Sequence, residues 1–344
     1  MDNSNPTMRM LMKTWESKIS IRISLAANDV SCPNLPLPMM VMLPRYGFLQ
    51  TVADKAFQSF ERALISKHDY TPYFEYNGLP LPWQVPLGSL YDLLADDQSP
   101  WRLIIRFPSA MPPALLPWIR SDSEKNFDLG PLRSVLFSSL KEAAFICRGV
   151  DGSNDMNMME VGKRDSLWES VVKVDWAGYN NWIESMDMNP LNRRAQEALP
   201  RIPIRIFHRK GKSVSDWSAD VKSMSRPISV QEDGRSPTLG EALNDIFPEL
   251  VFEEEQNDGG GLLGDELMRS TELSEDGDCE PSSKDQVFSQ SVAIVCGIQP
   301  PLATPLAWLH YNMHAPDFFL YIIVKPRNPF HRVESGSVGS GGGC

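Results

Sequence analysis

Two histidines are the first residues whose types and spacing could support chemistry. His310 and His314 lie four positions apart, which places both imidazoles on one face of a helix, as in many zinc sites. Zinc needs a third and a fourth ligand at a definable spacing, and the neighbouring sequence offers none. We therefore expect no metal site and interpret the pair as surface or half-buried histidines.

Five cysteines could supply a nucleophile, a disulfide or a metal ligand. Their odd number and wide spacing fit neither a disulfide framework nor paired zinc knuckles, so we expect a reduced compartment. Cys147 and Cys296 fall on an expected buried helix face and in an expected core strand, where a thiol behaves as a small hydrophobe. A cysteine hydrolase is therefore only a third hypothesis. The glycine run 259–261 follows no strand, no phosphate-binding or dinucleotide-binding motif is present, and we expect no cofactor.

Lys141 is the residue that carries the main hypothesis. Residues 135–148 around it show the period of one buried helix face, with apolar positions at Leu132, Leu136, Leu140, Ala143 and Cys147. At about 100° per residue, Lys141 falls nearly opposite that face, so we expect its amine in water. Phe137 and Phe145 lie one turn before and after it and are unusually apolar for neighbours of a solvated lysine. A neutral lysine amine can attack an activated carbonyl such as a thioester.

Two basic clusters each follow an expected strand. The first is His208, Arg209, Lys210 and Lys212, and the second is Lys325, Arg327, His331 and Arg332. If the two strands are neighbours in one sheet, the clusters merge into a patch for anionic lipid or an acidic partner. Ordinary solvated strand ends explain the same residues, and the sequence slightly favours that explanation.

Hydrophobic periodicity divides residues 14–120 into strands and helices. Alternation predicts strands at 19–23 and 39–43, and apolar spacing of three and four predicts a helix at 48–65. Further elements are expected at 73–76 (strand), 87–94 (helix) and 101–107 (strand). Asn77 and Gly78 form a strong turn signal after the third strand. One helix wrapped across such a mixed sheet is a β-grasp arrangement.

Residues 199–330 repeat this pattern. Expected strands at 202–206, 292–296 and 320–326, and a helix at 238–247 with Thr238 as its N-cap, follow the same order. Gly78 and Gly297 lie 219 positions apart, whereas Ile21 and Ile204 lie only 183 apart. The mismatch of about 36 residues indicates an insertion into the second copy.

The distribution of charge along the chain also indicates an insertion into the second copy. The formal net charge is −11, and residues 253–285 carry twelve acids against Arg269 and Lys284, which leaves the rest of the chain near −1. We expect this acidic stretch to be a disordered insertion. No basic stripe is present, so we expect no nucleic-acid partner. The first residues hold too short an apolar run for a signal peptide, and the longest apolar runs have the length of a strand, which predicts a cytosolic protein.

Several short segments resemble the autophagy-related protein 5 family, with plant-type members the most similar. Residues 139–143 (Ser-Leu-Lys-Glu-Ala), which contain Lys141, resemble the conjugation segment of that family. Other similar segments are 15–16, 74–76, 86–88, 92–94, 167–168, 202–206, 297–298 and 305–308. The resemblance runs in order from about residue 14 to residue 326, which is far more than one motif.

The resemblance implies an α+β fold in which two ubiquitin-like β-grasp domains flank a helix-rich domain. The expected division is a leader or short helix at 1–13, the first ubiquitin-like domain at 14–120, the helix-rich domain at 121–198, the second ubiquitin-like domain at 199–330 with a disordered acidic insertion at 253–287, and a flexible tail at 331–344. Within the helix-rich domain we expect a turn-rich break at 149–157 and a helix at 165–182.

The resemblance also implies a non-catalytic scaffold of autophagy. Lys141 would form an isopeptide bond with autophagy-related protein 12, with autophagy-related proteins 7 and 10 as the activating and conjugating enzymes. The conjugate would bind the coiled-coil autophagy-related protein 16. It would then act like a ligase, promoting transfer of autophagy-related protein 8 from autophagy-related protein 3 to phosphatidylethanolamine. Such a protein is cytoplasmic and peripheral on the phagophore membrane.

One alternative from another functional class remains open. The chain could be a non-conjugated adaptor whose β-grasp domains bind GTPases or other signalling proteins, with Lys141 inert. A covalent adduct mapped to Lys141 separates this hypothesis from the first.

Overall fold

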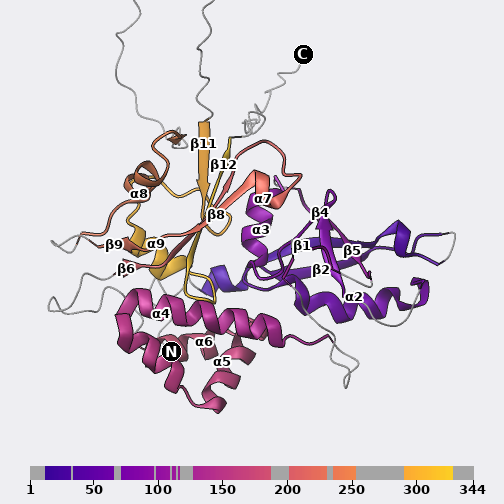
Figure 1. Cartoon of the computed structure of the whole chain (residues 1–344), viewed down its shortest axis with the longest axis horizontal. Helices are drawn as coiled ribbons and strands as arrows, with labels where there is room; N and C mark the ends of the chain where they lie inside the picture. The colour runs from indigo at the N-terminus through magenta and orange to yellow at the C-terminus, as the bar shows by residue number, and fades with distance from the viewer. Residues whose placement is uncertain are drawn as a thin grey trace, which may run out of the picture.

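The computed structural model describes residues 12–31, 34–65, 71–96, 98–108, 111–113, 115–116, 127–186, 201–230, 235–252 and 290–327. The expected acidic insertion and C-terminal tail lie outside these ranges, as does the leader (1–13) except for residues 12 and 13, which begin a helical stretch at 12–16. Figure 1 shows two sheets side by side and a group of helices packed against them. None of the helices in these ranges combines the length and the apolar character that crossing a membrane requires.

The first sheet has the strand order β2-β1-β5-β3-β4. Its elements are β1 (Lys18–Leu25), η1 (Ala27–Asp29), β2 (Met39–Pro44), η2 (Leu49–Val52), α2 (Ala53–Phe60), η3 (Glu61–Ala63), β3 (Tyr73–Tyr76), β4 (Leu79–Pro80), α3 (Leu87–Leu94) and β5 (Trp101–Arg106). β1 pairs with β2 in antiparallel and with β5 in parallel orientation. The alternating isoleucines of β1 are buried, as their period predicts. This is the expected β-grasp order.

The helix expected at 48–65 is divided into three pieces. η2 and η3 are 3₁₀ turns on either side of α2, so the regular α-helix holds only eight residues. Tight 3₁₀ turns are common at helix ends, and apolar spacing over four residues cannot distinguish them from α-helix. The buried residues Val52, Phe57 and Phe60 still line the core as their spacing predicts.

The second sheet has the strand order β10-β11-β12-β7-β8, with β12 parallel to β7. The elements of this part of the chain are β6 (Arg201–Ile202), β7 (Ile204–Arg209), α7 (Trp217–Asp220), β8 (Val221–Ser225), β9 (Ile228–Ser229), α8 (Leu239–Ile246), β10 (Val251–Phe252), β11 (Gln290–Ile294), α9 (Leu306–Met313) and β12 (Leu320–Pro326). The order of β8, β7, β12 and β11 repeats that of β2, β1, β5 and β3, so the two sheets are copies of one arrangement.

Several details of the second copy differ from the sequence-based expectation. The strand expected at 202–206 is interrupted at Pro203, which has no backbone N–H for a ladder and separates β6 from β7. β8 was not predicted, because its residues are mostly polar and exposed and show no apolar alternation. Thr238 does cap α8, where its side chain and Glu241 form a capping box.

The helix-rich region consists of α4 (Gly130–Met158), α5 (Val161–Lys173) and α6 (Trp176–Ser185). The break expected at 149–157 is confined to Gly149, whose φ of 65° and ψ of −145° are open essentially only to glycine. The single helix expected at 165–182 is two helices, because Val174 adopts a left-handed conformation and Asp175 caps α6. α4 otherwise extends the expected helix in both directions.

One hydrophobic cluster joins the first sheet to the helix-rich region and to one side of the second sheet. Trp15, from the helical residues before β1, lies at its centre. The Trp15 ring contacts Tyr46 after β2, at a centroid distance of 5.5 Å, and Tyr179 of α6, at 4.6 Å. A second cluster fills the interior between the second sheet and helices α8 and α9. The two sheets and α4–α6 are therefore held in one arrangement by shared core.

Candidate functional site

Lys141 lies on the solvent face of α4. The apolar period of α4 separates a buried face from an exposed face, as predicted. Leu136, Leu140 and Ala144 are buried, whereas Lys141 and Ser138 are exposed. The expectation that its amine stands in water is therefore confirmed. Within the described ranges, the Lys141 side chain forms no hydrogen bond or ion pair, so its amine is accessible to a partner protein.

The two aromatic neighbours of Lys141 have different surroundings. Phe145 is 46 % exposed, which is unusual for a phenylalanine on a helix surface. Phe137 is half-buried and lies under the guanidinium of Arg133, 5.7 Å from its ring centroid. Arg133 in turn forms an ion pair of 2.5 Å with Asp165 of α5. Phe145 is thus available for contact beside the amine, while Phe137 is held by α4 and α5.

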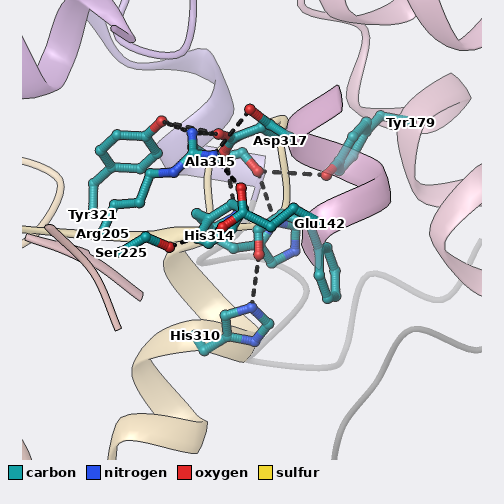
Figure 2. Close-up of polar contacts among 12 residues, drawn as sticks. Glu142, Tyr179, Arg205, Ser225, His310, His314, Ala315, Asp317 and Tyr321 are labelled. Atoms are coloured by element: carbon teal, nitrogen blue, oxygen red, sulfur yellow. Dashed lines mark hydrogen bonds and ion pairs between the residues drawn. The ribbon is translucent and has the colours of Figure 1, made fainter. Parts of the chain in front are cut away.

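Arg205 of β7 connects α4 to the second sheet next to Lys141, and Figure 2 shows its contact with Glu142, the residue after Lys141. Its Nη2 donates to Ser139 Oγ at 3.0 Å and lies 3.2 Å from Glu142 Oε2. The Ser225 hydroxyl of β8 donates to the other oxygen of Glu142 at 3.1 Å. Because residues on both sides of Lys141 are held in this way, the lysine is presented on a fixed helix rather than on a loop.

The other half of the Arg205 guanidinium binds a buried acid. Nη1 donates to Asp317 Oδ2 at 2.7 Å and to the Tyr321 hydroxyl at 3.1 Å, and that hydroxyl donates to Asp317 at 2.9 Å. Burial raises the pKa of Asp317 above its ordinary value, and the Arg205 charge offsets part of that rise. The guanidinium also lies 3.9 Å from the ring centroid of Phe319. The spacing of sequence motifs did not reveal this network, although Arg205 lies in the 202–206 segment.

His310 and His314 are buried, so the expectation of surface or half-buried histidines is wrong. Each ring donates to a backbone carbonyl, His310 Nε2 to Phe318 at 3.0 Å and His314 Nδ1 to Ala315 at 3.1 Å. Burial lowers the pKa of His310 to about 3 and that of His314 to about 4, so both are neutral at physiological pH. Among the described residues, no three histidines, cysteines or acids are grouped as metal ligands.

Neither described cysteine is placed as a nucleophile. Cys147 is buried on the inner face of α4, as expected. Cys296 lies just after β11 rather than within it, and its Sγ is 3.1 Å from the Tyr46 hydroxyl. Burial raises the pKa of the Cys296 thiol to about 11, which keeps it protonated at neutral pH. These observations argue against the cysteine hydrolase hypothesis.

The two basic clusters do lie on neighbouring strands, but two of their cations face the first sheet instead of solvent. Arg209 is buried and donates to the Leu93 carbonyl at 2.9 Å and to Asp96 at 3.0 Å. Lys325 lies 3.2 Å from the same Asp96 carboxylate. The expectation that these two strand ends are solvated is therefore wrong, because the end of α3 packs over them.

The remaining members of the clusters are dispersed. Lys210 is exposed and donates to the Ala219 carbonyl at 2.9 Å. Arg327 follows the end of β12 and its backbone N–H donates to Gln290. His331 and Arg332 lie outside the described residues. The structure brings Arg209 and Lys325 together as a bridge between the two sheets, and not as a patch with Lys210 and Arg327.

A groove of about 280 Å³ opens where the three parts of the chain meet. Its lining comes from the loop before α3, from α4 and from β7, β8, β12 and α7: Pro82, Gln84, Val85, Val135, Arg205, Phe207, Trp217, Ser223, Met224, Ser225 and Tyr321. The Phe207 and Tyr321 rings stack with centroids 6.0 Å apart and form an aromatic wall. Arg205 therefore belongs both to this groove and to the Lys141 turn.

Two sequence models of domains match this chain in the order of its two sheets. Residues 14–107 match the model described as autophagy protein ATG5, UblA domain, and residues 201–324 match the ATG5 UblB domain. The chain belongs to the autophagy protein 5 family. The expected fold, two ubiquitin-like domains that flank a helical region, is confirmed by these matches. Members of this family are generally non-catalytic.

Similarity to individual members of the autophagy protein 5 family extends along nearly the whole chain. Autophagy protein 5 of Arabidopsis thaliana is 28 % identical over 350 residues, which cover 92 % of this chain and 97 % of the relative. Autophagy protein 5 of Oryza sativa subsp. indica is 27 % identical, with 91 % and 92 % covered. The crystal structure of Kluyveromyces marxianus Atg5 shares the fold, with a TM-score of 0.65, 18 % identity, and coverage of 92 % of this chain and 100 % of that one.

Proposed function

We propose that this chain is the lysine acceptor for the ubiquitin-like autophagy-related protein 12, and that Lys141 forms the bond. The observation that carries the proposal is the exposed Lys141 on a turn of α4 whose other polar residues, Ser139 and Glu142, are held by Arg205. An acceptor amine must reach the carbonyl of a thioester in a second protein, so a fixed and unobstructed position reduces the entropy lost in docking. The exposed Phe145 ring offers that second protein an apolar contact one turn away.

The proposed reaction is an aminolysis. The Lys141 amine loses a proton and attacks the thioester carbonyl carbon, the carbon–nitrogen bond forms, and the carbon–sulfur bond breaks. The thiolate of the conjugating enzyme leaves and takes up a proton. Within the described ranges, no acid or base lies in hydrogen-bond contact with Lys141, so the conjugating enzyme, autophagy-related protein 10, supplies the base. Autophagy-related protein 7 activates the modifier beforehand.

The conjugate then acts as a ligase-like scaffold in this proposal. With the coiled-coil autophagy-related protein 16, it promotes the transfer of autophagy-related protein 8 from autophagy-related protein 3 to phosphatidylethanolamine. The protein is cytoplasmic and is recruited to the phagophore membrane as a peripheral component. The alternative, a non-conjugated adaptor, requires Lys141 to be inert and leaves the exposed Phe145 unexplained.

Replacing Lys141 by arginine tests the acceptor assignment. Lys141→Arg keeps the positive charge and the fold, but a guanidinium does not attack a thioester, so the covalent conjugate is expected to be absent. Denaturing electrophoresis of the chain from its native source, followed by mass spectrometry of the heavier band, measures the conjugate. Lys163→Arg, at an exposed lysine of α5, is the matched control and should conjugate normally. Conjugation of the Lys141→Arg variant at the normal level contradicts the proposal.

The groove between the three parts of the chain is a candidate binding site for the coiled-coil partner. We propose that one helix of autophagy-related protein 16 lies in it, since a helix presents a narrow apolar stripe and most of the groove lining is apolar or aromatic, with a few neutral polar side chains and one cation, Arg205. A partner seated there contacts both ubiquitin-like domains and α4. Lys141 is not among the residues that line the groove, so both partners can bind together.

A carboxylate placed in the groove tests the second part of the proposal. Met224→Asp is expected to weaken binding of the coiled-coil partner about tenfold or more, because the interface would bury an unpaired charge. Titration calorimetry with the purified chain measures the loss. Met158→Asp, at an exposed methionine at the end of α4, should bind normally. Equal affinity for both variants places the partner elsewhere. The Lys141 conjugate should form on both.

A further inference from the structure

On the outer face of the first sheet, the neighbouring strands β1, β2 and β5 together carry basic residues and no acid. β1, β2 and β5 together contain Lys18, Arg22, Arg102 and Arg106 and no aspartate or glutamate. This composition is notable in a chain whose formal net charge is −11. The side chains on the inner face of β1 and β5 are buried in the core, which α2 shares, whereas those on the outer face are exposed or half-buried; Figure 1 shows α2 beside this sheet.

Two of these cations lie directly opposite each other. Arg22 of β1 pairs in register with Arg102 of β5, and both side chains are exposed. Within the described ranges, neither guanidinium forms an ion pair, whereas Arg106 lies near both Asp29 and Glu75. Like charges at facing positions of neighbouring strands repel each other and destabilise a sheet. Two facing arginines without an acidic counterpart in this part of the structure would be neutralised by an anionic partner.

Apolar side chains border the two arginines on the same face. Met40 of β2 lies opposite Arg22, and Met42 lies opposite Ser20, two residues along. Both methionines are 57 % exposed, and Ile104, two residues after Arg102, is 37 % exposed. Side chains two residues apart on a strand share one face, so these groups form one surface. Large exposed apolar groups beside unpaired cations are typical of a docking surface.

We propose that this surface binds an acidic amphipathic helix of a partner protein. The row Met40, Arg22, Arg102 crosses three strands, or about 10 Å, which matches the diameter of one helix. Apolar residues of that helix would cover Met40, Met42 and Ile104, and its carboxylates would pair with Arg22 and Arg102. The surface is separate from Lys141 and from the three-part groove, so the inference does not depend on conjugation.

A synthetic peptide tests this inference on the purified full chain without any conjugate. The probe is a fluorescent helical peptide with a leucine stripe flanked by glutamates, and its counterpart carries lysine in place of every glutamate. Fluorescence anisotropy should show binding of the glutamate peptide alone, weakening as salt is added. Arg22→Glu should reduce that affinity about tenfold, because it replaces an attraction by a repulsion. Arg62→Glu, at an exposed arginine of η3 elsewhere in the domain, should leave the affinity unchanged.

A stability measurement separates a binding role of Arg22 from a structural one. The carboxylate introduced by Arg22→Glu lies opposite Arg102, so the Tm of this variant should be equal to or above that of the wild type while peptide binding falls. Absence of glutamate-peptide binding, equal binding of the lysine peptide, or equal affinity of Arg22→Glu overturns the proposal. The proposal is also overturned if the glutamate peptide fails to bind while the chain either binds vesicles containing phosphatidylserine or dimerises through this face.

Discussion

Arg205→Leu is expected to lower the free energy of unfolding by about 3–5 kcal/mol, because it leaves the Asp317 carboxylate buried without its partner. Asp317 is 5 % exposed and receives Arg205 Nη1 at 2.7 Å. The variant also releases Ser139 and Glu142, so the Lys141 turn loses its attachment to the second sheet. Urea unfolding at pH 7 measures the loss.

The matched control is an exposed ion pair of the same chemistry. Arg226 and Asp245 are 2.8 Å apart, and both side chains are largely in water. Arg226→Leu should therefore change the free energy of unfolding by less than about 1 kcal/mol. Equal effects of the two substitutions would show that burial of Asp317 has no energetic consequence.

The pH dependence of the Arg205→Leu variant has a definite sign. Burial already raises the pKa of Asp317, and removal of the Arg205 charge raises it further. When the pKa of an aspartate is higher in the folded than in the unfolded state, its ionised form disfavours folding, and protonation removes that cost. The deficit should therefore be largest at neutral pH and shrink as the pH falls through the raised pKa. The double variant Arg205→Leu with Asp317→Asn should remove this pH dependence, and a deficit that is the same at pH 7 and pH 5 contradicts the explanation.

Trp15→Ala is expected to lower the free energy of unfolding by about 3–5 kcal/mol, because it leaves a cavity in the shared core. Trp15 is 2 % exposed and its ring contacts Tyr46, Trp176 and Tyr179. Its indole N–H has no acceptor among the described residues, so the loss is one of apolar packing. Chemical denaturation measures the destabilisation, and hydrogen exchange should show that α6 loses protection, since two of the three contacts lie on that helix.

An exposed tryptophan provides the control for the Trp15 substitution. Trp308 of α9 is 43 % exposed, so Trp308→Ala should change the free energy of unfolding by about 1 kcal/mol or less. If the two substitutions have equal effects, Trp15 does not connect the first sheet to the helix-rich region in the way we describe.

The sequence by itself determined the features that depend on local periodicity and on order along the chain. The alternating isoleucines of β1, the capping signal at Thr238 and the exposed face of α4 at Lys141 are all read from residues a few positions apart. The duplicated order of strands and helices follows from the arrangement of such local signals, whereas the family was indicated by the resemblance of short segments such as 139–143. The ends of the helices were predicted less accurately. Residues 49–63 form three short helical pieces, and the left-handed Val174 separates two helices. Neither feature changes the spacing of the apolar residues, so the sequence pattern could not reveal it.

Only the tertiary structure decided which charged and polar groups face solvent. Arg209 and Lys325 lie at the C-terminal ends of β7 and β12, yet both contact Asp96, more than a hundred positions away in sequence. His310 is likewise buried by packing that its own helix does not encode. Arg205 likewise forms ion pairs with Glu142 and Asp317, both of which are distant from it in the sequence. Contacts of this kind depend on how the two sheets and α4 dock, and no local period records that arrangement.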